Sequence, residues 1–204
     1  MMQRAIIVLM IFCILSCNDK KTIYPEKLDT KNSAKFDLKK FNENKIDSTY
    51  EYVLKDTIIR LYEEKDFYKK ELIANNHSFN HVFGYNKTTN SLVNEFCYFF
   101  RMPIGVWKSY NEKGSLINWK NYDEGFDFTI KELIVKLKKD FQIDLINDTN
   151  YQLLTIDRFS YKRLYFITSY CYLLEIASMD GTRIIKIDGE TGEILSDEKS
   201  FIEE

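Results

Sequence analysis

The chain has 204 residues, of which 45% are hydrophobic and 29% charged, and this composition excludes an intrinsically disordered protein. A formal net charge of −2 at pH 7 and a pI of about 5.8 exclude the large basic face with which proteins bind nucleic acid. An aromatic content of 15% with only 2 Pro and 7 Gly favours β-strands, and the length suits one ordinary domain or two small ones.

The first sixteen residues have the layout of a secretory signal peptide. Arg4 precedes an uninterrupted apolar run from Ala5 to Leu15, and the small residue Ser16 follows it. The run is far shorter than the roughly 20 apolar residues that a membrane-spanning helix needs. We therefore expect residues 1–16 to be removed by cleavage rather than kept as a membrane anchor.

The residues around this cleavage point add a second signal. The sequence Ile14-Leu15-Ser16-Cys17 resembles the bacterial lipobox, which implies that the Cys17 thiol receives a diacylglycerol and becomes the new N-terminus. Two or three acyl chains of the palmitate type hold a soluble domain on a membrane, at about 0.8 kcal/mol per buried methylene. The resemblance predicts a membrane-anchored lipoprotein of the cell envelope, with the outer membrane as the expected location. An ordinary secretory signal cut near Cys17 is the alternative.

Residues 17–45 are rich in Lys, Asp, Asn and Thr, with only scattered apolar side chains. Such a segment cannot bury much surface, so we expect a lipidated N-terminus followed by a flexible tether. The part from Phe36 to Phe41 is apolar enough to dock on the domain as a short helix.

Residues 46–126 read as an aromatic-rich β-hairpin region. From about Tyr50 to Tyr122, apolar and polar residues alternate, which predicts a meander of antiparallel strands. The segment 56–74 is ambiguous, because its Glu and Lys residues also suit a helix. Further along, Gly114 supplies the positive φ that a tight hairpin turn requires.

One hairpin of this region carries a family pattern. Gly105, Trp107 and Tyr110, followed by Gly114 and Leu116, resemble the MORN-type repeat found in the antitoxin-like MORN family of bacteria. The resemblance implies β-hairpins that contact proteins or membrane surfaces. The candidate binding residues are then the four large aromatic side chains of this hairpin, Trp107, Tyr110, Trp119 and Tyr122. The alternative is that the four rings are only packing residues, with Trp107 and Tyr110 facing Leu116 and Trp119 across the hairpin.

The hydrophobic period then changes from two to that of a helix. One apolar stripe is formed by Ile130, Leu133, Ile134, Leu137 and Phe141. Thr129 and Glu132 have the spacing of a capping box at the start of this helix. Strand-like segments follow at residues 151–157, 164–177 and 182–188.

The C-terminal stretch ends in a specific turn, Asp188-Gly189-Glu190-Thr191-Gly192, after which Ile194 and Leu195 return. A capped helix followed by antiparallel strands and this turn resembles the PepSY-like domains of exported bacterial proteins, over roughly residues 126–196. That resemblance implies a non-catalytic α+β module that inhibits or binds other proteins.

The predicted fold class is therefore α+β. An antiparallel meander of MORN-like hairpins in residues 46–126 is followed, in residues 127–204, by one amphipathic helix packed on a small antiparallel, PepSY-like sheet.

Few residues suggest chemistry. His77 and His81 have the spacing of two metal ligands on a helix, but no HExxH motif and no third ligand accompany them. Asp188, Glu190 and Glu193 gather oxygens at one turn, yet the EF-hand pattern is absent. There is no Gly-x-Ser-x-Gly elbow and no phosphate loop. We expect no catalytic residue, no metal site and no cofactor.

Two cysteines remain after the signal peptide and the lipidated Cys17 are set aside. Cys97 and Cys171 can form a disulfide in an exported protein. Each lies in an aromatic run, however, where a free buried thiol packs as a small hydrophobic group. Both alternatives stay open at this point.

The sequence thus predicts a non-catalytic protein- or glycan-binding module of the cell envelope. Its partners are the membrane, through Cys17, and an envelope protein or glycan. The alternative is an inhibitor or immunity protein that acts against a toxin or a protease. A hydrolase is the third reading, and it requires two carboxylates that converge in a deep cleft.

Overall fold

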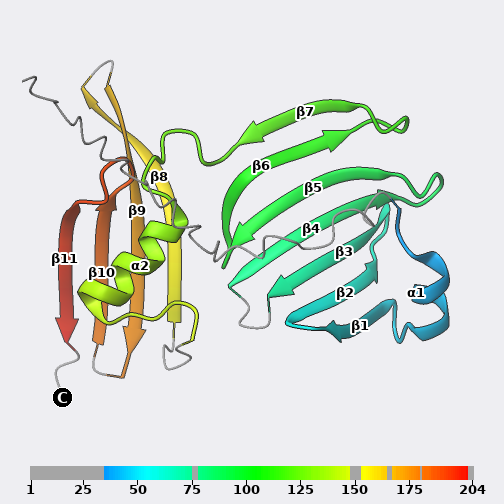
Figure 1. The fold of residues 1–204 in the computed structure, drawn as a ribbon, viewed down its shortest axis with the longest axis horizontal. Helices are drawn as coiled ribbons and strands as arrows, with labels where there is room; N and C mark the ends of the chain where they lie inside the picture. Colours follow the sequence, from blue (N-terminus) through cyan, green and yellow to red (C-terminus); the bar gives the residue numbers. More distant parts are fainter. Residues whose placement is uncertain (1–34, 75–77, 148–152, 165–166, 180, 202–204) are drawn as a thin grey trace, which may run out of the picture.

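The structure, a computed structural model, describes residues 35–74, 78–147, 153–164, 167–179 and 181–201. Two antiparallel sheets dominate it, a seven-stranded sheet in the order β1-β2-β3-β4-β5-β6-β7 and a four-stranded sheet in the order β11-β10-β9-β8 (Figure 1). About 60% of the described residues are in strands, and the same residues contain only two short helices. The predicted α+β class is therefore wrong, and the fold is mostly β.

The seven-stranded sheet is a simple meander in which each strand pairs with the next one in the chain. Residues 56–74, which the sequence left ambiguous, form two of its strands rather than a helix. The alternation decides this, because Ile59, Leu61 and Leu72 all point to one buried face. The strands are β1 Thr49–Leu54, β2 Thr57–Glu63, β3 Phe67–Ala74, β4 Phe79–Asn86, β5 Leu92–Phe99, β6 Met102–Tyr110 and β7 Leu116–Asn121.

A short helix, α1 (Leu38–Asn44), docks on this sheet as the sequence suggested for residues 36–41. Its N-cap is Asp37, whose carboxylate accepts a hydrogen bond from the amide of Lys40 at 3.0 Å. Phe36 and Phe41 are buried, with 2% and 0% of their surfaces exposed. A flexible tether that reaches residue 45 is therefore too long, because the folded domain already includes these two rings.

The second helix, α2 (Ile130–Phe141), starts with the predicted capping box. Thr129 donates its backbone N–H to the Glu132 carboxylate at 2.9 Å, and the Glu132 amide donates back to the Thr129 hydroxyl at 3.3 Å. The predicted apolar stripe is buried against the smaller sheet. The strands of that sheet are β8 Leu153–Leu164, β9 Ile167–Ser178, β10 Gly181–Asp188 and β11 Ile194–Phe201.

One continuous core joins the two sheets. Phe99 and Met102, at one end of the seven-stranded sheet, belong to the same buried cluster as Leu133 of α2 and Leu174 of β9. Arg158 of β8 reinforces this junction, since its guanidinium donates to the carbonyl of Tyr122 at 3.0 Å. We call this cluster the joint core, and the cluster around Phe36 and Phe41 the α1 core.

The two faces of the seven-stranded sheet differ. One face, which we call the covered face, carries both cores, and the row Ile59, Leu72, His81, Cys97 and Ile104 runs across it in register. The other face carries the neighbouring row Arg60, Glu71, Val82 and Phe96. Neither described helix packs on this second face, which we call the open face.

Candidate functional site

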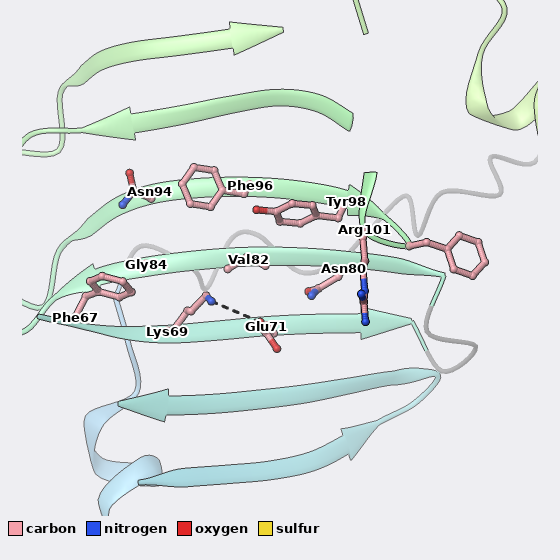
Figure 2. A pocket seen from close by; sticks show the side chains of 11 residues that line it. Phe67, Lys69, Glu71, Asn80, Val82, Gly84, Asn94, Phe96, Tyr98 and Arg101 are labelled. Carbon is pink, nitrogen blue, oxygen red and sulfur yellow. Dashed lines mark ion pairs between the residues drawn. The ribbon is translucent and has the colours of Figure 1, made fainter. Parts of the chain in front are cut away.

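A hollow of about 370 Å³ lies on the open face over β3, β4 and β5 (Figure 2). It exists because the middle of β4 places only the small residues Val82 and Gly84 on this face, while the flanking strands carry longer side chains. The volume is within the range of small-ligand sites. The wall on β3 is charged and the wall on β5 is aromatic, so the hollow is amphipathic.

The charged wall centres on Glu71, whose side chain is 12% exposed. Its carboxylate accepts a hydrogen bond from the Tyr62 hydroxyl at 2.8 Å and lies 3.4 Å from Arg60 Nη1 and 3.8 Å from Lys69 Nζ. Burial, and then the hydrogen bond to Glu71, raise the pKa of Tyr62 above its ordinary value. Glu71 is thus held in place and its charge is balanced by two cations.

The aromatic wall is a packed row of rings. The Trp107 ring lies 4.7 Å from Phe96, 5.1 Å from Tyr98 and 4.5 Å from Tyr122, measured between centroids. The Trp107 indole N–H donates to the Cys97 carbonyl at 3.1 Å. Because each ring is held by its neighbours, this wall is rigid before any ligand arrives, which lowers the entropy cost of binding.

One end of the hollow carries polar groups that lack partners. Asn80 Oδ1 is buried and accepts no hydrogen bond, and Arg101 makes no ion pair within the described part of the chain. Figure 2 shows both side chains at the same end of the hollow, with Asn80 across from Tyr98 on the neighbouring strand. A buried acceptor without a partner costs about 1–3 kcal/mol, so a ligand donor that reaches Asn80 regains this energy.

The four aromatic residues predicted to bind do not share one surface. Trp107 and Tyr122 lie on the open face, whereas Trp119 is opposite Lys108 on the covered face, and 61% of its surface is exposed. Tyr110 does pair with Leu116 as predicted. The register shifts at a bulge between Ser109 and Tyr110, so Trp107 is opposite Lys120 and not Trp119.

A polar cluster that the sequence did not predict lies on the covered face, between the two cores. Glu95 accepts hydrogen bonds from His81 Nε2 at 3.2 Å, from Lys108 Nζ at 3.2 Å and from the Tyr110 hydroxyl at 3.1 Å. The His81 hydrogen bond, aided by Lys108, lowers the pKa of Glu95 to about 2 despite its partial burial. Burial, and then Glu95, raise the pKa of Tyr110 to about 12.

Only one of the two histidines that were considered as metal ligands and set aside lies within the described residues. His81 is on β4 rather than on a helix, stacks on Phe83 with centroids 4.3 Å apart and is bound to Glu95. His77 lies outside the described residues, as do residues 1–16 and Cys17. The described residues include no group of three His, Cys, Asp or Glu side chains that would hold a metal ion.

The predicted C-terminal turn is present, and it uses the carboxylate of Asp188, one of the three carboxylates considered as calcium ligands, for hydrogen bonds within the turn. Asp188 Oδ1 accepts hydrogen bonds from the amides of Glu190 and Thr191 at 3.0 and 2.9 Å. Gly192 has φ +74°, and a Cβ there would lie 2.5 Å from the Phe128 ring. The Asp-Gly-x-Thr-Gly pattern thus serves a tight turn that packs against the segment before α2.

Both cysteines of the possible disulfide are free thiols. Cys97 packs against the joint core, whereas Cys171 precedes Tyr172 on β9 and so points to the opposite face of the smaller sheet. Cys97 is opposite His81 in the strand register, a pairing that suits a nucleophile and its base. Burial, however, raises the pKa of Cys97 to about 12, so the thiol stays protonated at neutral pH.

In the described part of the chain, no helix is both long enough and apolar enough to span a membrane. Comparisons with protein-family models, with curated proteins and with solved structures gave no match. The MORN-like and PepSY-like resemblances therefore remain predictions, and the functional argument rests on the geometry of this chain.

Proposed function

We propose that this protein is a non-catalytic binding protein of the bacterial cell envelope, anchored by lipid on Cys17, which holds its ligand on the open face of the seven-stranded sheet. The observation that carries the proposal is the hollow over β3, β4 and β5. Its aromatic wall is packed and its charged wall is hydrogen-bonded, and at one end Asn80 Oδ1 and Arg101 have, among the described residues, no hydrogen-bond donor and no ion-pair partner respectively.

The lining of the hollow favours binding over catalysis. The described residues that line it include no Ser, Thr, Cys or His, so no nucleophile stands beside a base. The single carboxylate, Glu71, is already engaged by Arg60, Lys69 and Tyr62. A hydrolase would need a second carboxylate facing this one, and the described lining has none.

The anchor is tested separately from the binding. We expect the Cys17→Ser variant to leave the membrane fraction, because acyl chains on this sulfur would be the only strong attachment that the proposal assigns. Mass spectrometry of the wild-type protein should find Cys17 at the N-terminus with acyl chains attached. An intact Met1, or an unmodified thiol at position 17, would contradict the anchor without touching the binding proposal.

The binding face is tested with the double variant Phe96→Ala and Tyr98→Ala in the full chain. We expect its affinity for isolated envelope material to fall at least tenfold, because central aromatic contacts each contribute more than about 1 kcal/mol. The matched control is Ile117→Ser with Trp119→Ser on β7, where both side chains are exposed. Trp107 and Trp119 should not be changed together, since they lie on different faces.

The same experiment tests a second candidate function, that of an inhibitor or immunity protein. The observation in its favour is the edge strand β7, where Leu116, Ile117 and Trp119 are all exposed. A free edge with apolar side chains can pair with an extended segment of another protein. If the β7 variant loses binding and the Phe96 and Tyr98 variant keeps it, the contact is made through this edge and the open-face proposal is wrong.

A further inference from the structure

We infer that the ligand of the hollow is an acidic glycan, an oligosaccharide in which at least one sugar bears a carboxylate. This inference rests on the proposed function, because it names the ligand class of the same open face. It follows from the floor of the hollow, from the kind of polar groups in its walls and from the charge of its lining.

The floor of the hollow suits a chain of rings lying along β4. Val82 and Gly84 form this floor between the charged wall on β3 and the aromatic wall on β5. A Cβ added at Gly84 would meet its nearest atoms, those of Asn94, at 3.6 Å, an ordinary van der Waals distance. A single Cβ would therefore fit at Gly84 in contact with Asn94, whereas a larger side chain would extend into the hollow that Gly84 lines.

The position of the hollow disfavours a peptide. β4 is paired with β3 on one side and β5 on the other, so its backbone N–H and C=O groups are already used in the sheet. An extended peptide on this face would find no backbone partners, and peptides accordingly bind at sheet edges. Sugar hydroxyls need only side-chain partners, and Lys69, Glu71 and Asn94 offer both donors and acceptors.

The aromatic wall complements the other side of a sugar ring. The faces of Phe96 and Tyr98 carry the negative potential of an aromatic π-system. The C–H groups on one face of a pyranose are apolar and weakly positive, so they pack against such rings while the hydroxyls reach the opposite wall. An amphipathic hollow with rigid walls matches a ligand that has this same division.

The charge of the lining selects an acidic sugar. Lys69 and Arg101 are the cations of the described lining and Glu71 is its anion, so the hollow has a net positive charge. Lys69 is paired with Glu64 and Glu71, which leaves Arg101 as the cation without an ion pair among the described residues. A guanidinium binds a carboxylate through two parallel hydrogen bonds, so Arg101 is the group that would select an acidic sugar.

The test uses the full-length protein in detergent and oligosaccharides that contain glucuronate, galacturonate, N-acetylmuramate or sialate, each beside its methyl ester. We expect calorimetry to detect binding of at least one acid, and at least tenfold weaker binding of its ester. Arg101→Gln should weaken the acid at least tenfold and leave the ester unchanged. Gly84→Leu should abolish binding of both, because its side chain fills the floor without a positive φ or a backbone clash.

The outcomes separate this inference from the proposed function. A dissociation constant of 1 mM corresponds to a binding free energy on the order of 4 kcal/mol. If no acid binds more tightly than this, the ligand is not an acidic glycan. That holds even if envelope material still binds through Phe96 and Tyr98. If esters bind as tightly as acids, the role of Arg101 is wrong. If the control variant Ile117→Ser with Trp119→Ser loses binding as Gly84→Leu does, the hollow is not the site.

Discussion

Replacing Phe41 with alanine is expected to lower the free energy of unfolding by about 3–5 kcal/mol, the range for a large aromatic side chain lost from a core. Phe41 is completely buried, and its ring lies 5.2 Å from Phe36 and 6.0 Å from Tyr68 between centroids. α1 has only seven residues, too few to form a helix in isolation, so its order depends on this contact.

Urea denaturation followed by circular dichroism measures the effect. The matched control is Lys39→Ala, an exposed position of the same helix, which should change stability by less than about 0.5 kcal/mol. If Phe41→Ala costs no more than this control, α1 does not belong to the folded unit. Residues 36–44 would then be part of the tether after all.

The sequence predicted best those elements that depend on neighbouring residues. The helix from Ile130 was placed together with its capping box, because Thr129 and Glu132 satisfy each other within one turn. The turn after Asp188 was found for the same reason, since its carboxylate binds the next amides in the chain. These signals need no knowledge of the rest of the fold.

The prediction of the fold class was wrong because the length of a strand depends on partners that are distant in the sequence. β8 and β9 are each twelve residues long and form an extended hairpin, in which Ser160 pairs with Tyr170 and Tyr161 with Ser169. Phe159 and Tyr161 do alternate with polar neighbours, but both rings are exposed rather than part of a core, and we did not predict residues 158–163 as strand. The long hairpin of β8 and β9 and the two strands in residues 56–74 together make the fold mostly β rather than α+β.

The hollow was beyond prediction because it needs the register of three strands at once. Val82 and Gly84 leave a hollow only because longer side chains, such as Glu71 and Phe96, stand on the same face of the neighbouring strands. Trp107 was predicted as a binding residue that faces the other strand of its hairpin, but the bulge at Ser109 and Tyr110 places Lys120 opposite it. A bulge inserts an extra residue in one strand, and nothing in the local pattern gives its position.

Glu95→Gln is the second substitution with a large expected effect, and the effect depends on pH. His81 and Lys108 lower the pKa of Glu95 from 4.5 to about 2, so the native state favours the ionised carboxylate. A lowered carboxyl pKa stabilises the fold above pH 4.5, and this contribution is lost as the pH falls towards 2. We expect the variant to be less stable than wild type by about 2–3 kcal/mol at pH 6 to 7.

The pH series distinguishes this cluster from ordinary surface pairs. Between pH 4.5 and pH 2 the gap between wild type and Glu95→Gln should close, because protonated Glu95 resembles the neutral amide. Glu51→Gln, which removes an exposed pair with Arg60, serves as the control and should cost less than about 1 kcal/mol at any pH. A gap that stays constant down to pH 2 would mean that Glu95 acts by packing rather than by charge. In that case the cluster on the covered face joins the two cores by packing, and the contacts of Glu95 with His81 and Lys108 add little to stability.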